Sequence, residues 1–385
     1  MQKAQEILGK ATGGALGTKL PTAKLGKNGP EVTRMGFGLM GLDEADYSKS
    51  AFYGAPKPDE ERFKVLDKCY ELGELFWDSA DMYNDSEDLL GKWFKANPGK
   101  RDNIFLATKF ANKIDAQGNR SVDSSPEYCR EACERSLRRL GVPFIDLYYV
   151  HRLSKETPIE KTMEELKKLK QEGKIKYIGL SECSSESLRR ACKIEHVDAV
   201  QVEYSPFSLD IESDQIGLLK TCRELGCAIV AYSPLGRGML GGKIRTCSRP
   251  DGCTRAVEAN PAAPGSPKDF EEGDFRKFAP RFSEENFPKN LKLVDQITEL
   301  AKKKNATPSQ LTLAWLLHQG SDIFPIPGTT NLDRLQENID ALKIKLTKEE
   351  EQEIRRACEA AEVHGGRYPE AFSAALFADT PPLNP

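Results

Sequence analysis

The chain has 385 residues, of which 39% are hydrophobic, and this is enough for one large α/β domain with a closed core. Its 56 basic and 59 acidic residues give a formal net charge of -3. Such a balance provides no field that would recruit nucleic acid or an anionic membrane surface. No stretch reaches the roughly 18 uncharged apolar residues that a membrane span requires. We therefore expect a small-molecule partner.

The first residues predict no folded element. Residues 1–19 contain scattered lysines and glycines but lack the apolar core of a secretory signal. We expect an N-terminal extension over residues 1–30 that is frayed. A weak organellar signal is the alternative, against which the absence of arginine from this segment argues.

Short apolar runs alternate with amphipathic segments from Met35 to Leu342, an order that favours parallel strands joined by right-handed crossovers. Eight apolar runs indicate strand ends near Gly38, Asp78, Lys109, His151, Leu180, Val202, Tyr232 and Pro327. Eight strand ends predict a closed (β/α)8 TIM barrel over residues 31–345 rather than an open sheet.

Capping residues mark several helices between these runs. Ser125-Pro126 opens a helix that Gly141 closes, and Thr157-Pro158 opens one that ends at Gly173, with Thr157 as the cap. A further amphipathic helix is predicted over residues 214–225.

The interval between the seventh and eighth strand ends is far longer than one helix and one strand need, which predicts an insertion over residues 233–289. Its part at 247–288 is rich in glycine, proline and charge; we expect a lid, and a disordered loop is the alternative. Helices are expected at 291–304 and from Thr307. Residues 346–385 predict a C-terminal helix and an aromatic tail, which either packs on the barrel wall or lines the substrate pocket.

The ten cysteines are spread from Cys69 to Cys358 without any Cys-x-x-Cys pair. Cys129 and Cys133 continue the apolar stripe of a helix, so we interpret them as small core residues. Reduced thiols of this kind favour a cytoplasmic location.

Four polar residues near successive strand ends could together carry out proton transfer. A tyrosine with a pKa of about 10 is a poor proton donor at neutral pH until a nearby cation stabilises its phenolate. Lys109 would supply that cation to Tyr83, Asp78 would hold the lysine in place, and His151 would orient a bound carbonyl oxygen. Such residues at strand ends meet on one face of a parallel barrel.

Several motifs in a fixed order make the sequence resemble the aldo-keto reductase superfamily. The matching segments are residues 76–83, 107–110, 146–151, 173–181 and 334–338. The resemblance, which includes fungal and plant members and pyridoxal reductases, implies NADPH-dependent carbonyl reduction by the tetrad Asp78, Tyr83, Lys109 and His151, with Tyr83 as general acid. Asp81 is a local competitor for the aspartate role, although the five-residue offset to Tyr83 favours Asp78.

Cofactor contacts are expected beyond the later strands. Residues 325–331 leave the eighth strand and begin a helix, offering N–H groups and hydroxyls to a phosphate, and Arg334 could fork onto a 2′-phosphate. A capped helix with a solvated arginine is the alternative. The glycine-rich loop at 233–238 could bring backbone amides to the pyrophosphate.

By resemblance, Gln201 completes the carboxamide site and Tyr232 stacks on the nicotinamide. The full set expected to bind NADP(H) is Ser181, Glu182, Gln201, Tyr232, Ser233, Leu235, Gly236, Gly238, Gly328, Thr329, Thr330, Arg334, Glu337 and Asn338.

Two positions depart from much of the family. Gly328 stands where many members have a lysine against the 2′-phosphate, so the discrimination between NADPH and NADH depends more on Arg334. Glu182 stands where many have asparagine; it can accept a hydrogen bond from the nicotinamide amide but cannot donate one when ionised.

The four histidines make no pair with the spacing typical of zinc, so we expect no metal site. We expect a small-molecule carbonyl substrate and a monomer or weak homo-oligomer. Aromatic residues at Phe52, Tyr53 and Tyr149 indicate an apolar pocket, with pyridoxal as one candidate. The alternative function is an NADPH-binding regulatory or redox-sensing subunit with little turnover.

Overall fold

The computed structural model describes residues 19–42, 57–114, 119–244, 267–270 and 274–383. Phe52 and Tyr53 lie outside these residues, as does the first part of the expected lid, residues 247–266. No helix in the described ranges is both long enough and apolar enough to cross a membrane.

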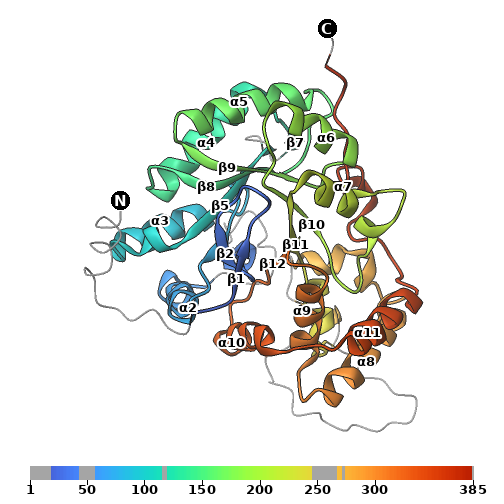
Figure 1. The fold of residues 1–385 in the computed structure, drawn as a ribbon. Helices are drawn as coiled ribbons and strands as arrows, with labels where there is room; N and C mark the ends of the chain where they lie inside the picture. Colours follow the sequence, from blue (N-terminus) through green and yellow to red (C-terminus); the bar gives the residue numbers. More distant parts are fainter. Residues whose placement is uncertain (1–18, 43–56, 115–118, 245–266, 271–273, 384–385) are drawn as a thin grey trace.

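Eight parallel strands form one curled sheet at the centre of the molecule (Figure 1). In spatial order they are β12 (Ile323–Pro325), β11 (Ala228–Tyr232), β10 (Ala199–Glu203), β9 (Ile175–Ser181), β8 (Ile145–Val150), β5 (Phe105–Phe110), β4 (Phe76–Asp78) and β3 (Phe37–Gly38). The amide of Gly36 donates to the carbonyl of Pro325 (3.0 Å) and that of Gly38 to Pro327 (3.3 Å). These bonds join the two edges, and the predicted (β/α)8 barrel is confirmed.

Helices surround the strands and bury one apolar face each (Figure 1). They are α2 (Asp59–Leu72), α3 (Ser86–Ala96), α4 (Pro126–Leu140), α5 (Ile159–Gln171), α6 (Ser185–Ile194), α7 (Leu218–Leu225), α8 (Phe287–Lys303), α9 (Pro308–His318), α10 (Leu332–Asp340) and α11 (Lys348–Ala360). Cys129 and Cys133 are fully buried between α4 and the barrel, as predicted. The eight cysteines in the described ranges are free thiols.

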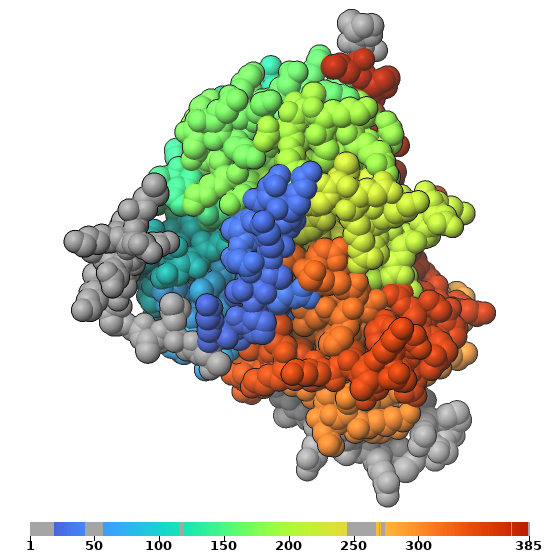
Figure 2. All heavy atoms as spheres, viewed as in Figure 1, coloured from blue at the N-terminus to red at the C-terminus, as the bar shows by residue number. Residues whose placement is uncertain are grey.

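A hairpin of β1 (Thr22–Lys24) and β2 (Glu31–Thr33) covers the end of the barrel where the strands begin. Figure 2 shows it lying across this face. Leu25 is fully buried at its turn with Ala199 and Ala228, the first residues of their strands, and the amide of Lys27 donates to the carbonyl of Gly226 at 2.8 Å. The expected boundary at residue 30 passes through this hairpin, so the ordered part of the extension belongs with the barrel.

The helix signals agree with the structure in part. The Ser125 side chain caps α4, Gly141 ends it with a φ of 63°, and a capping box at Thr307 opens α9. The prediction for α5 was wrong by one residue, since Pro158 itself is the N-cap and makes no side-chain bond. The helix expected at 214–225 begins only at Leu218, because Gly217 with a φ of 58° interrupts it.

The remaining elements are short or lie late in the chain. They are the hairpin of β6 (Asn112–Ile114) and β7 (Arg120–Val122), the 3-10 turns η1 (Met40–Leu42), η2 (Lys100–Asn103), η3 (Asp210–Glu212), η4 (Gly236–Gly241), η5 (Pro267–Asp269), η6 (Phe275–Phe278), η7 (Pro280–Phe282) and η8 (Ala341–Lys343), and the one-turn α12 (Glu370–Ser373). After α11, the C-terminal tail runs past α7 and α6 (Figure 1). There Ala378 forms a parallel bridge with Cys183, directly after β9.

Candidate active site

Asp78 and Lys109 form a buried ion pair at the carboxyl ends of β4 and β5. Lys109 Nζ donates to Asp78 Oδ1 at 2.5 Å and to the carbonyl of Ser79 at 2.7 Å. Burial raises the pKa of Asp78 and lowers the pKa of Lys109, while their mutual attraction opposes both shifts. Gln201 Nε2 donates to the other carboxylate oxygen at 2.8 Å. The carbonyl of Ser79 and the side-chain amide of Gln201 therefore hold the pair in place.

Tyr83 lies beside this pair on the loop between β4 and α3. The ammonium of Lys109 is 5.0 Å from the centre of the Tyr83 ring, and the Tyr83 and His151 rings meet edge to face with centroids 5.9 Å apart. Burial, with the charges of Arg152 and Lys109, lowers the pKa of His151 well below its ordinary value. His151 is consequently neutral at physiological pH, and its Nδ1 makes no hydrogen bond to any described residue.

Asp81, the competitor for the aspartate role, pairs with an arginine and not with Lys109. It pairs with Arg135 at 3.3 Å, and burial together with the charge of Glu87 raises the pKa of Asp81 to about 7. The structure therefore brings together Asp78, Tyr83, Lys109 and His151, as the spacing in the sequence predicts.

Glu182 does not have the environment that was expected from the sequence. Its carboxylate is fully buried and accepts hydrogen bonds from Tyr232 Oη (2.7 Å), Arg367 Nη1 (3.2 Å) and the amide of Glu203 (3.3 Å). All three donors bond the same oxygen, Oε1, and Oε2 lies 3.5 Å from Arg367 Nη2, so the carboxylate holds Tyr232 and the tail in place.

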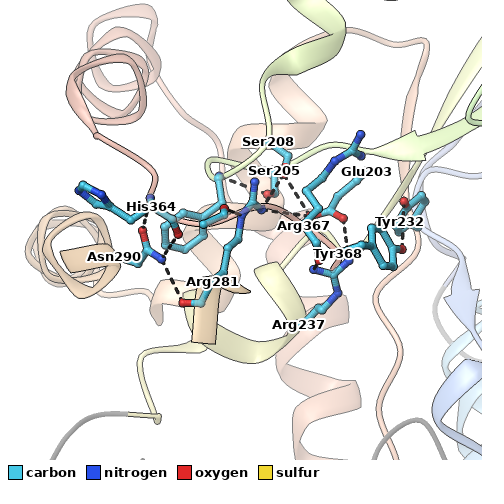
Figure 3. A network of polar contacts seen from close by, with 12 residues as sticks. Glu203, Ser205, Ser208, Tyr232, Arg237, Arg281, Asn290, His364, Arg367 and Tyr368 are labelled. Atoms are coloured by element: carbon cyan, nitrogen blue, oxygen red, sulfur yellow. Dashed lines mark hydrogen bonds and ion pairs between the residues drawn. The ribbon is translucent and has the colours of Figure 1, made fainter. Parts of the chain in front are cut away.

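A buried ionic network that the sequence did not reveal is centred on Glu203 (Figure 3). Glu203 pairs with Arg237 at 2.9 Å and with Arg281 at 3.2 Å, and Arg237 Nη1 donates to the carbonyl of Arg367 at 2.9 Å. Burial opposes ionisation of Glu203, but the three arginines outweigh it and hold the pKa of Glu203 below its ordinary value. The network ties β10, the insertion and the tail to one another.

The tail also reaches the site through Tyr368. Its hydroxyl is 3.3 Å from that of Tyr232, and Arg237 lies over its ring, 4.7 Å from the centroid (Figure 3). Of the two alternatives for the tail, this contact favours a wall of the pocket at Tyr368, while Ala378 packs beside β9 farther along. No local pattern in the sequence could have shown the contact with Tyr232, because Tyr368 is 136 residues away from it along the chain.

The loop after β11 is more strained than its glycines alone suggest. Ser233 and Arg237 have positive φ values of 47° and 56°, beside Gly236 and Gly238. The amides of Gly236 and Gly238 donate to the carbonyls of Ser233 and Leu235 within the loop. These two amides are thus bonded within the loop, and the approach of the loop's other backbone amides to a pyrophosphate stays a prediction.

The segment after β12 has the predicted form of a capped helix start. Asn331 caps α10 through the amide of Arg334, and the Arg334 side chain is exposed. Gly328 lies against β3: a Cβ at this position would be 2.4 Å from the carbonyl oxygen of Gly38. The backbone geometry therefore excludes the lysine that much of the family places there.

The other expected cofactor residues lie along the same edge. Ser181, the last residue of β9, is buried and its hydroxyl is 3.4 Å from Arg152 Nη1. Glu337 pairs with Lys243 of the insertion at 3.6 Å, and Asn338 is buried in α10. Thr329 and Thr330 are half-buried at the helix start.

Among the residues described, no group of three or more His, Cys, Asp or Glu side chains could hold a metal ion. His318 bonds instead to the carbonyl of Ala314 and the amide of Leu346, which is a structural role.

Comparisons with known proteins agree with this site. The model of the Aldo/keto reductase family matches residues 34–359. The aldo-keto reductase yakc [NADP(+)] of Schizosaccharomyces pombe is 49% identical over 367 residues, covering 94% of this chain and 99% of the relative. Aldo-keto reductase str7 of Strobilurus tenacellus is 48% identical over 364 residues, covering 94% and 99%.

Among solved structures, the glycerol dehydrogenase AKR11B4 of Gluconobacter oxydans superimposes with a TM-score of 0.73 at 24% identity. The match covers 88% of this chain and 95% of that one, and it shows the shared fold. The chain therefore belongs to the aldo/keto reductase family.

Proposed function

We propose that this protein reduces an aldehyde or ketone to the alcohol, with NADPH as the hydride donor and Tyr83 as the proton donor. Family membership supports an NADP-dependent oxidoreductase that acts on carbonyl groups. The observation that supports the mechanism is the ammonium of Lys109, fixed by Asp78 and 5.0 Å from the Tyr83 ring centre.

In this proposal each tetrad residue has a task. The positive charge of Lys109 favours the phenolate of Tyr83, which makes its phenol a stronger acid; each unit by which the pKa falls corresponds to about 1.4 kcal/mol. Asp78 keeps the ammonium beside the ring. His151, being neutral, can donate a hydrogen bond to the carbonyl oxygen and orient it without competing as the acid.

The residues around the tetrad fit a nicotinamide nucleotide. NADPH, when bound, supplies the hydride. Ser181 and Gln201 lie next to the tetrad and Tyr232 offers an aromatic face, while the start of α10 offers N–H groups and Arg334 for phosphate. The close approach of Gly328 to Gly38 keeps side chains away from this edge of the barrel.

Turnover with a panel of aldehydes and ketones, followed by NADPH oxidation at 340 nm, tests the proposal. We expect steady oxidation that depends on the carbonyl compound. The alternative of a regulatory or redox-sensing subunit predicts tight NADPH binding with at most very slow turnover on every compound, and that result would refute the enzymatic function. The panel also includes pyridoxal, the candidate taken from the family resemblance.

The eight free cysteines support a cytoplasmic location.

A further inference from the structure

Arg152 is a charged residue of the site to which no role has been assigned. It follows His151 directly after β8 and is half-buried. Its Nη1 donates to the carbonyl of His151 at 2.7 Å and lies 3.4 Å from Ser181 Oγ. Its electrostatic neighbours are Tyr232, Tyr368, Glu182 and Tyr83. The guanidinium therefore lies between the tetrad and the tail.

Arg152 differs from the other cations of the site because no carboxylate pairs with it among the described residues. Lys109 pairs with Asp78, Arg237 and Arg281 pair with Glu203, and Arg367 pairs with Glu182. Burial lowers the pKa of Arg152, but Glu182 and the neighbouring tyrosines outweigh it and raise the pKa, so the guanidinium stays charged without an ion pair of its own in the described part of the chain. Arginines in this situation are suited to an anionic ligand.

The free side of the guanidinium has the geometry that a carboxylate requires. Both hydrogen bonds of Arg152 come from Nη1, so no described residue accepts from Nε or Nη2. These two groups form the planar edge that binds a carboxylate through two parallel hydrogen bonds. Glu182 is an electrostatic neighbour of Arg152, but it is fully buried and engaged by Arg367 and Tyr232.

We propose that Arg152 binds a carboxylate of the substrate, so that the preferred substrates are aldehydes or ketones that also carry a carboxylate group. This inference rests on the proposed function, since it names the class of carbonyl compound that the same site reduces. Arg152 would set specificity by holding the acid group while the carbonyl faces Tyr83 and His151.

Matched substrate pairs test the proposal directly. The 2-, 3- and 4-carboxybenzaldehydes are each compared with their methyl esters, which keep the aldehyde and remove the charge. We expect kcat/KM to favour at least one acid over its ester. The acid-to-ester ratio should fall roughly 10- to 100-fold in Arg152→Gln, the range for a charge-assisted hydrogen bond, and less in Arg152→Lys, which keeps the charge but loses the fork.

Arg138→Gln is the matched control, because it removes one arginine charge from the exposed face of α4. Its ratio should equal that of the wild type. A wild-type preference for all three esters, or an unchanged ratio in Arg152→Gln, would overturn the inference while leaving carbonyl reduction in place. Taking a ratio cancels any general loss of activity in the variant.

Binding of a carboxylic acid that has no aldehyde or ketone group to reduce provides a second test. It needs neither turnover nor a folded variant. Calorimetry on the wild-type protein saturated with NADP+ should detect benzoate and give at least tenfold weaker binding for benzamide, which lacks the charge. Equal affinities would overturn the role of Arg152. If the aldehyde panel is inert but benzoate binds selectively, the proposed reaction fails and the anion site stands.

Discussion

The buried network between the barrel and the tail predicts that Arg367 is essential for stability. Glu182 is 0% exposed and Arg367 is 6% exposed, so replacing Arg367 with methionine leaves a carboxylate in the interior without its cation. Breaking a buried pair in this way costs about 3–5 kcal/mol. Methionine retains part of the packing against Phe377, whose ring centre is 4.9 Å from the guanidinium, so the loss reports mainly on the charge.

Urea denaturation at pH 7 measures this effect. The double variant Glu182→Gln/Arg367→Met should recover most of the loss, because the carboxylate that makes the single change costly is gone. Arg223→Met is the control: its pair with Asp322 is largely exposed, and its removal should cost no more than about 1 kcal/mol. A loss below 1 kcal/mol for Arg367→Met, or an equal loss in the double variant, would refute the reasoning.

Two further predictions concern the cofactor and pH. Arg334→Ala should lower the NADPH-to-NADH ratio of kcat/KM by roughly 10- to 100-fold, and an unchanged ratio would contradict its role at the phosphate. Burial raises the pKa of Glu74 from 4.5 to about 8. Because the folded state holds this proton, Glu74 contributes stability that is fully present below pH 4.5 and is lost as the pH rises to 8, at about 1.4 kcal/mol per pH unit, or on the order of 5 kcal/mol in total. Urea unfolding at pH 5, 6.5 and 8 should therefore show the wild type losing stability relative to Glu74→Gln, and a constant difference would contradict the assignment.

The sequence predicted the barrel and the tetrad because both depend on local patterns. Each strand is a short apolar run, and Asp78, Lys109 and His151 interrupt or follow such runs where parallel strands end together. Closure of the barrel brings these ends to one face whatever the details of the helices. The five-residue offset between Asp78 and Tyr83 then places the tyrosine beside the pair.

The sequence could not predict contacts between segments that are distant along the chain. Arg367 meets Glu182, and Arg281 meets Glu203, only because the tail and the insertion fold back over the barrel. Side-chain type alone led to the expectation that Glu182 bonds the cofactor. In the structure its carboxylate is buried and pairs with Arg367. Arg152 was detectable in principle, since it directly follows His151, but its missing counter-charge is visible only in three dimensions.

The most direct test of the central claim is hydride transfer by Tyr83→Phe. Phenylalanine keeps the ring that packs against His151 and removes only the hydroxyl. We predict that the variant binds NADPH within about twofold of the wild type, measured by quenching of tryptophan fluorescence, and that kcat for the best carbonyl substrate falls by roughly 10²- to 10⁴-fold, the usual contribution of a general acid. A Tyr83→Phe protein whose kcat stays within tenfold of the wild type would contradict the assignment of Tyr83 as the proton donor.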